Sequence, residues 1–224
     1  MKRIFISLLM CAAFLSAHAQ HVNLANDLGI AEEDKEAITE RIVAKVDELQ
    51  RGIQDMAGIG TMSRKGKEGQ RDVILKLFIA EGKPYTARVP SRWGEYKDST
   101  CQVMMTIINS KLKKKRERRP MRHYFNQLIE RSVNPNYRYK KVVIEAADAV
   151  RVDNFTKVGE GKYMATAHIL QHFAGYSGDG HIIYHDYTAK TIAVEITRLE
   201  QNTEEGVVTM WNILLGDVDC DDIW

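Results

Sequence analysis

Apolar residues recur every three or four positions between residues 32 and 57, and charged residues fill the positions between them. This is the spacing of one helix face, so it predicts a long amphipathic helix. Acidic residues in the first turn and Gly58 and Gly60 after the last turn mark its ends. The single apolar stripe needs a partner, either a later sheet or a second copy in a coiled coil. The stripe consists of Ile38, Ile42, Val46, Leu49, Ile53 and Met56.

The next hundred residues predict shorter elements with polar connections. Residues 58–70 are rich in glycine and charge and indicate a surface loop. Residues 70–82 favour a short helix, with a strand as the alternative, and their inward residues would be Val73, Ile74, Leu77 and Phe78.

Two short strands and a helix are predicted next. Residues 83–90 indicate a strand that stops at Pro90. Residues 99–110 fit a strand or a helix, which periodicity cannot separate, and we favour a strand. Residues 121–132 repeat apolar positions at helical spacing, directly after Pro120, which suits the start of a helix.

The stretch from Lys140 to Asp219 predicts four long strands, at residues 140–155, 161–176, 190–201 and 207–219. In the third, apolar Ile192, Val194 and Ile196 alternate with other residues, so one face of that strand is buried. The fourth is apolar on both faces. A glycine-rich link at residues 176–181 predicts a hairpin, so the strands that it joins are antiparallel.

This order of elements predicts an α+β fold. It resembles the nuclear transport factor 2-like (cystatin-like) superfold, a curved antiparallel sheet wrapped around N-terminal helices as a cone, over roughly residues 32–218. The passages "RRPMRHYFNQLIE", "LQHFAGYSGDG" and "WNILLGDV" also resemble a group of exported Bacteroidetes proteins on this scaffold. The resemblance implies a pocket inside the cone, for which Trp211, Tyr163 and Phe173 are the candidate lining residues.

The start of the chain predicts export. Lys2 and Arg3 precede an apolar run and a small-residue ending at Ala19, which is the pattern of a signal peptide over residues 1–19. No later run is long enough to cross a membrane, so no integral membrane span is expected. We therefore expect a periplasmic or extracellular protein with a lead-in at residues 20–31, one domain at 32–219 and an acidic tail at 220–224.

The charge of the chain is balanced once this signal is removed. The full chain has 32 Lys and Arg against 30 Asp and Glu, so loss of Lys2 and Arg3 leaves 30 of each. The basic run from Lys111 to Arg119 is of a kind that binds nucleic acid or anionic membranes. Export, the balanced charge and the lack of interleaved aromatic residues favour a solvated loop instead, with no nucleic-acid partner.

Two sets of residues are candidate sites. Cys101 and Cys220 remain after export and are either a disulfide pair or free thiols. The acid and histidines of the predicted hairpin are a candidate transition-metal site, with solvated surface residues as the alternative. This candidate set is His168, His172, His185 and Asp186.

No sequence motif indicates catalysis. The chain has no Gly-x-Ser-x-Gly motif and no phosphate-binding loop, and no cofactor is expected. The leading hypothesis is an exported, non-enzymatic binding or accessory domain for a small apolar ligand or an envelope protein. The alternative is an enzyme of isomerase or dehydratase type that does acid–base chemistry in the cone. A homodimer formed through the exposed face of the sheet is a further hypothesis.

Overall fold

The computed structural model describes residues 29–90, 95–109, 115–204 and 206–223. The predicted signal peptide, residues 20–28 of the predicted lead-in and the start of the basic run at Lys111 lie outside these residues. The chain divides into two compact units, Met1–Ala37 and Ile38–Trp224. The description below concerns the second unit, together with the full extent of the helix that begins in the first.

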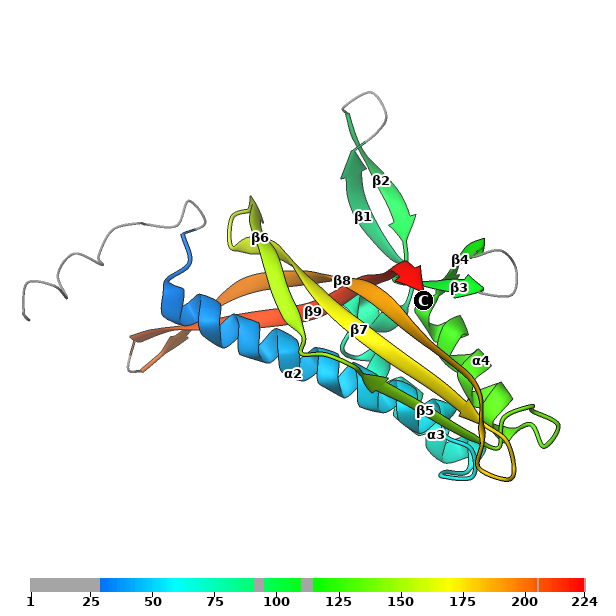
Figure 1. The fold of residues 1–224 in the computed structure, drawn as a ribbon. Coiled ribbons are helices and arrows are strands. Elements are labelled where there is room, and N and C mark those ends of the chain that lie inside the picture. The colour runs from blue at the N-terminus through cyan, green and yellow to red at the C-terminus, as the bar shows by residue number, and fades with distance from the viewer. Residues whose placement is uncertain (1–28, 91–94, 110–114, 205, 224) are drawn as a thin grey trace, which may run out of the picture. The chain divides into compact units, whose positions relative to one another are not determined.

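Helices occupy the N-terminal half of the described chain (Figure 1). The predicted helices at residues 32–57 and 121–132 are confirmed. None of the helices in the described residues is long and apolar enough to cross a membrane. The helices are α2 (Glu32–Ala57), α3 (Arg64–Leu75), the short 3-10 helix η1 (Ile79–Gly82) and α4 (Met121–Val133).

Seven strands form a mixed sheet, which confirms the α+β class, and two further strands pair as a separate ribbon. In the sheet, β4, β3, β9, β8, β7 and β5 follow one another, and β6 pairs with the remaining length of the β7 edge. The ribbon is β1 (Tyr85–Pro90) with β2 (Tyr96–Cys101), and the sheet strands are β3 (Met104–Asn109), β4 (Lys115–Pro120), β5 (Lys141–Ala146), β6 (Arg151–Gly159), β7 (Lys162–Tyr176), β8 (Ile182–Thr203) and β9 (Gly206–Ile223).

The prediction of a wholly antiparallel sheet is wrong for one pair of strands and confirmed for the others. Strands β7, β8 and β9 are antiparallel neighbours as predicted, but β3 pairs with β9 in the parallel sense at Met105 and Val218. The predicted strand at residues 140–155 is two strands, β5 and β6, with an interruption between them. Residues 147–150 break the strand, and both halves pair with β7.

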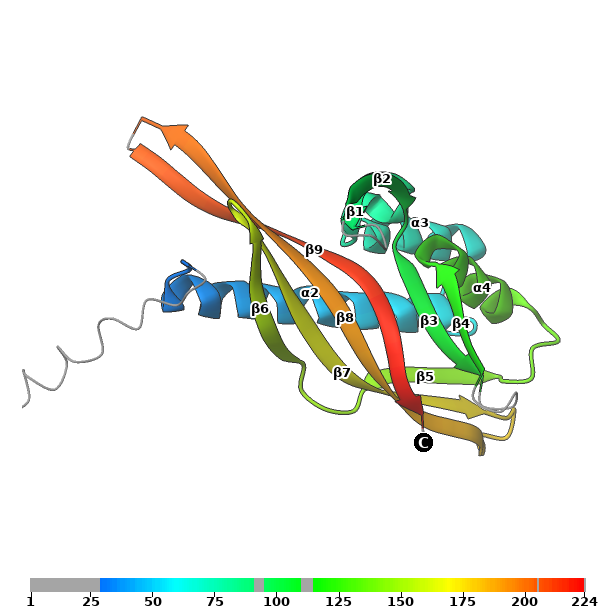
Figure 2. The same ribbon diagram turned by 90° about the horizontal axis from the view of Figure 1, so that it is seen from above.

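Successive residues of each strand point to opposite faces of the sheet. We call the face that carries buried Tyr163 of β7 and Ile192 of β8 the inner face, and the opposite one the outer face. Helix α2 runs along the inner face (Figures 1 and 2). Its apolar stripe, which extends from Ile38 to Met56, is buried in the core. Gln54 also completes the free edge of β5: its Nε2 donates to the Val142 carbonyl at 3.2 Å and its Oε1 accepts from the Ile144 N–H. The end of α2 is thereby attached to the sheet.

Helix α3 begins inside the segment that was predicted to be a surface loop. Ser63 caps the helix by accepting from the Gly66 N–H at 3.2 Å. Lys67 is fully buried, and its Nζ donates to the carbonyls of Asp55, Met56 and Gly58 at the end of α2. The loop prediction is confirmed for residues 58–63 and wrong from Arg64 onward, where Lys67 caps the end of α2 and its charge is stabilised by the negative end of the helix dipole.

The predicted short helix at residues 70–82 is also divided. Helix α3 ends at Leu75 and η1 follows, so only part of the segment is helical. Ile74, Leu77 and Phe78 are buried as expected, but Val73 is about half exposed. Phe78 reaches the core beside α4, where its ring centroid lies 6.4 Å from that of Phe125.

The basic run and the acidic C-terminal end both form strands, β4 and β9, which lie on either side of β3 in the sheet. A bulge in β9 at Gly216 and Asp217 re-aims Asp217, whose carboxylate accepts from the Met104 N–H at 2.9 Å and from Arg118 at 2.5 Å. The described part of the basic run is therefore strand β4 and not the predicted loop. Likewise β9 continues to Ile223, so residues 220–223 are strand and not a separate tail.

Candidate functional site

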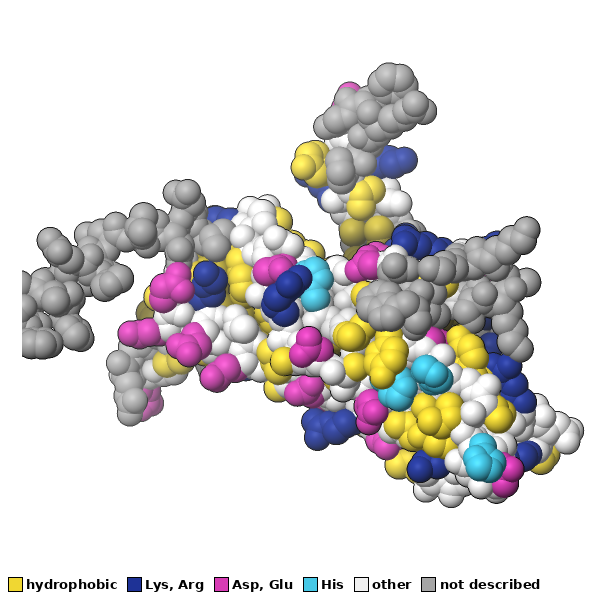
Figure 3. All heavy atoms as spheres, in the orientation of Figure 1, with side chains coloured by type: hydrophobic (Ala, Val, Ile, Leu, Met, Phe, Trp, Pro, Cys, Tyr) yellow, Lys and Arg dark blue, Asp and Glu magenta, His cyan; other side chains and the backbone are white. Residues whose placement is uncertain are grey.

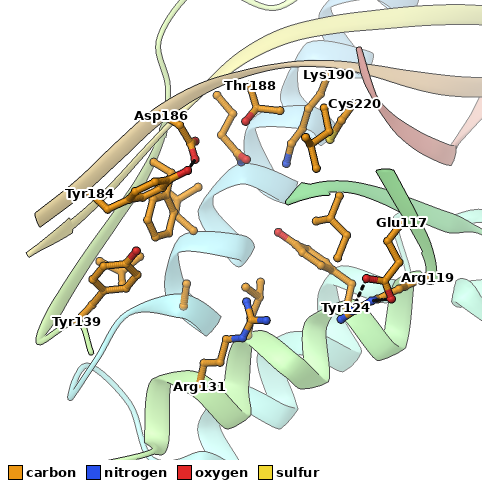
Figure 4. Close-up of a pocket in the computed structure, with 18 of the residues that line it drawn as sticks. Glu117, Arg119, Tyr124, Arg131, Tyr139, Tyr184, Asp186, Thr188, Lys190 and Cys220 are labelled. Carbon is orange, nitrogen blue, oxygen red and sulfur yellow. Dashed lines mark hydrogen bonds and ion pairs between the residues drawn. The ribbon is translucent and has the colours of Figure 1, made fainter. Parts of the chain in front are cut away.

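A cavity of about 500 Å³ lies beneath the inner face of the sheet, with α4 on its opposite side (Figure 4). Its walls come from β3, β4, β5, β7, β8 and β9, the end of α2, and α4 with the turn that follows it. The lining residues are Ala57, Ile107, Ile108, Glu117, Arg119, Tyr124, Leu128, Arg131, Tyr137, Arg138, Tyr139, Val142, Ile144, Gln171, Phe173, Tyr184, Asp186, Thr188, Lys190 and Cys220.

Strand β8 supplies the polar wall of this cavity. Alternate residues of a strand share a face, so Tyr184, Asp186, Thr188 and Lys190 point to the same side as buried Ile192. From Ile192 to Ile196 the inner positions of β8 are aliphatic and form solid core. The strand therefore changes along its length from a polar cavity wall to a packed apolar face.

Lys190 is the most deeply buried of the charged residues that line the cavity. Its side chain is only 5% exposed, and burial lowers the pKa of its amine, although Cys220 and Asp186 oppose this shift. Among the described residues no hydrogen bond or ion pair holds the ammonium group. Such burial of an unpaired charge is costly, because the protein interior replaces water poorly.

Tyr124 of α4 faces Lys190 from the other side of the cavity. Burial raises the pKa of its phenol above the ordinary value. Figure 4 shows the ring directed into the cavity from the helix and the Lys190 side chain directed into it from the sheet. The Tyr124 hydroxyl has no hydrogen-bond partner within the described part of the chain, so the cavity contains a second unsatisfied donor.

Both carboxylates of the wall have partners. Glu117 pairs with Arg119 at 2.6 Å, and this contact holds the pKa of Glu117 below its usual range. Asp186 accepts a hydrogen bond from the Tyr184 hydroxyl at 2.6 Å. The acids are therefore engaged with neighbouring side chains, unlike Lys190.

The end of the cavity away from Lys190 is aromatic. The ring centroid of Phe173 lies 5.6 Å from that of Tyr139 and 5.9 Å from that of Tyr184. The Arg138 guanidinium lies over the Tyr139 ring, 4.3 Å from its centroid. Gly175 allows this arrangement, because a Cβ at that position would be 2.5 Å from the Tyr139 ring.

Buried phenols make the fold sensitive to alkaline pH. Burial raises the pKa of Tyr139 from 10.0 to about 12. The unfolded chain releases this proton near pH 10 and the folded chain retains it, so the free energy of unfolding falls as pH rises above 10. We expect Tyr139→Phe to lose less stability than the wild type between pH 10 and 12, measured by urea unfolding at each pH.

Tyr96→Phe, at an exposed position of β2, is the matched control and should retain the wild-type pH dependence. The explanation would be wrong if wild type and Tyr139→Phe lost equal stability over this range.

One of the three predicted cavity residues lines the cavity. Phe173 does, whereas Tyr163 and Trp211 pack against each other in the solid core, with ring centroids 5.8 Å apart. The Trp211 Nε1 is buried without a hydrogen-bond partner among the described residues. The resemblance implied a pocket lined by these three rings, but it does not show where the core of this chain leaves space.

The predicted metal set is divided between the two faces of the sheet. His172 and His185 are diagonal neighbours on the outer face, with ring centroids 6.4 Å apart, but Asp186 points to the inner face. His168 pairs with Asp153 at 3.0 Å, and His172 pairs with Glu145 at 3.2 Å. No group of three His, Cys, Asp or Glu residues in the described chain is arranged to hold a metal. Figure 3 shows histidines at the surface where β5, β7 and β8 end.

The two cysteines are free thiols in the structure. Cys101 is half-buried at the end of β2. Cys220 is buried on β9, where it lines the cavity and its Sγ donates to the Thr106 carbonyl at 2.7 Å. Burial raises the pKa of the Cys220 thiol, so its environment favours the protonated, unreactive form.

Sequence analysis did not identify Lys190 or Tyr124. A signal for Lys190 was present, because extending the alternation of Ile192, Val194 and Ile196 backwards along β8 puts Lys190 and Thr188 on the buried face. A charged residue at an inward strand position indicates a special environment. No comparable signal marks Tyr124, which occupies an ordinary inward position of a helix.

A scan against protein-family models, a search of curated proteins and a search of solved structures each found no match for this chain. The functional argument therefore depends on the cavity itself.

Proposed function

We propose that this protein is an exported binding protein that holds one small, largely apolar organic molecule in the cavity beneath the sheet. The observation that carries the proposal is the open volume of about 500 Å³, which lies within the range of about 300 to 1,000 Å³ typical of ligand sites. Its mixture of aliphatic and aromatic walls with a few directed polar groups also matches such sites.

The scaffold supports the same proposal. A sheet with a long helix along its inner face is the arrangement expected of a nuclear transport factor 2-like protein, and we propose that the fold is of this cone-shaped type. Ligand pockets between the sheet and the helices are a property of that type. The envelope protein partner and the homodimer remain predictions.

Ligand binding should raise the thermal stability of the purified protein, because a ligand that binds only the folded state stabilises it by mass action. The probes are phenylalkanoic acids of increasing chain length and the matched alcohols and amines, tested by thermal unfolding and calorimetry. We expect at least one probe to bind at one site per chain and to raise Tm. No saturable binding by any probe would contradict the proposal.

A variant that fills the cavity tests where the probe binds. Leu128 lines the cavity from α4, so Leu128→Trp should abolish binding while the protein remains folded. The matched control is Leu199→Trp, which adds the same group at a position on β8 that is 45% exposed and does not line the cavity. Equal binding by both variants would place the ligand elsewhere.

One observation favours the alternative of an acid–base enzyme. The Lys190 amine, whose pKa is lowered by burial, lines the same cavity as the Asp186 and Tyr184 pair, and a lysine with a lowered pKa gives up its proton more readily, as a general base requires. Such an enzyme would return a bound substrate chemically changed. NMR spectra of the probes recovered after long incubation distinguish the two functions, and we expect unchanged probes.

A further inference from the structure

The polar groups of the cavity are unequally satisfied. The ammonium of Lys190 offers three donors and the hydroxyl of Tyr124 offers one, and neither has a hydrogen-bond partner in the described part of the chain. Lys190 and Tyr124 are 5% and 8% exposed, and both line the cavity. The carboxylates of Glu117 and Asp186 are both engaged. Lys190 and Tyr124 are therefore donors that lack an acceptor within the described residues, and a ligand that enters the cavity can supply one.

The charges of the wall lead to the same conclusion. Four cationic side chains line the cavity and only two carboxylates do. Glu117 and Arg119 compensate each other, which leaves three cations against Asp186 alone. The cations other than Arg119 are Lys190, Arg131 and Arg138. Lys190 is buried, whereas Arg131 and Arg138 are exposed and their charges are screened by solvent, so the excess adds a positive potential that favours a bound anion.

From these observations we propose that the ligand is an organic monocarboxylate, whose carboxylate accepts hydrogen bonds from Lys190 and Tyr124. This inference rests on the proposed function, because it concerns the chemistry of the same cavity. A carboxylate brings one negative charge and two acceptor oxygens, which matches one ammonium and one hydroxyl on opposite walls.

The position of the rest of the ligand follows from the strand. Lys190 and Tyr184 are six residues apart on β8, a distance of about 20 Å along an extended chain. Tyr184 belongs to the aromatic end with Tyr139 and Phe173. Figure 4 shows Lys190 and Tyr139 at separate ends of the cavity. The apolar body of the acid therefore extends from Lys190 towards the aromatic rings, where a terminal ring would pack.

A lysine whose role is to bind a ligand and a lysine whose role is to stabilise the fold have different effects on Tm when they are replaced. Without a ligand, the unpaired ammonium of Lys190 is a cost to the folded state, so its replacement by apolar methionine should raise Tm. The same replacement removes the charged donor and should weaken binding of the acid. A structural lysine would give a lower Tm when replaced.

The test compares phenylalkanoic acids with the alcohols and amines of equal chain length, by calorimetry on the full chain. For the wild type we expect the acid to bind about 10- to 100-fold more tightly than the alcohol, as one charged hydrogen bond provides, and the amine not to bind. Lys190→Met should remove the preference for the acid and leave binding of the alcohol intact. Tyr124→Phe should reduce the preference several-fold.

Lys157→Met is the matched control, since Lys157 is exposed on β6 and does not line the cavity. It should retain the full preference for the acid. Equal binding of acid and alcohol by the wild type would overturn this inference and leave the proposed function standing. An acid preference that persists in Lys190→Met would overturn it as well. If no probe binds at all, the proposed function itself fails.

Discussion

Lys67→Met is expected to lower the free energy of unfolding by about 2 to 4 kcal/mol. The Lys67 ammonium is fully buried and donates to the carbonyls of Asp55, Met56 and Gly58, two of them at 3.0 and 3.1 Å. These carbonyls end helix α2 and have no partner within it. The Gly58 carbonyl also accepts from the Thr61 hydroxyl at 3.2 Å. Removal of Lys67 therefore leaves the carbonyls of Asp55 and Met56 unsatisfied, at a cost of about 1 to 3 kcal/mol each, and the relief of lysine desolvation offsets only part of this cost.

Urea unfolding of three variants measures this effect. Lys65→Met makes the same exchange at an exposed position of α3 and should change stability by less than about 0.5 kcal/mol. Lys67→Arg keeps the charge but should remain destabilised, because a planar guanidinium cannot reach three carbonyls that converge on one atom. If Lys67→Met were as stable as the wild type, the contacts of Lys67 with α2 would not support the fold.

Gly52→Ala is expected to lower the free energy of unfolding by about 1 to 3 kcal/mol, although alanine is the better helix former. A Cβ on Gly52 would lie 2.3 Å from Cγ1 and 2.6 Å from Cδ1 of Ile74. Ile74 is fully buried on α3 and has little space into which to move. The glycine therefore allows α2 and α3 to approach closely.

Gly69→Ala is the matched control, because Gly69 lies on α3 with no atom within 4 Å of the position of its Cβ. There only helix propensity acts, and we expect stability to rise by about 0.5 to 1 kcal/mol. The two substitutions should shift the urea midpoint in opposite directions. Shifts of the same sign would show that the contact between Gly52 and Ile74 does not limit the packing of the two helices.

The two lysines show how far the sequence could be interpreted. The segment around Lys67 is polar and glycine-rich, which is typical of a loop, and the local helix signal was only the capping residue Ser63. The stabilising partner of Lys67 is the end of α2, which the pattern of residues 58–70 does not specify. Lys190 belongs to a strand with clear alternation, so its inward direction follows from the sequence, but the cavity around it does not.

The basic run shows a similar limit. A row of like charges repels itself and is usually solvated, so the loop prediction followed from the residues alone. In the folded chain Arg118 pairs with Asp217, and Arg116 donates to the Asp221 carbonyl, both on β9. Residues about a hundred positions away thus compensate the charge of Arg118 and accept a hydrogen bond from Arg116, and both contacts support β4. This outcome depends on the pairing of the sheet and on the bulge at Gly216.

The sequence by itself determined the α+β class, helices α2 and α4, and the antiparallel order of β7, β8 and β9, because each is specified by local periodicity and turn residues. Only the tertiary structure decided where the inner face is packed solid and where it is hollow. Tyr163 and Trp211 fill one part, and Lys190 and Tyr124 border the space in another. The reason is that a cavity is what remains after distant segments have packed, and no single segment encodes its volume.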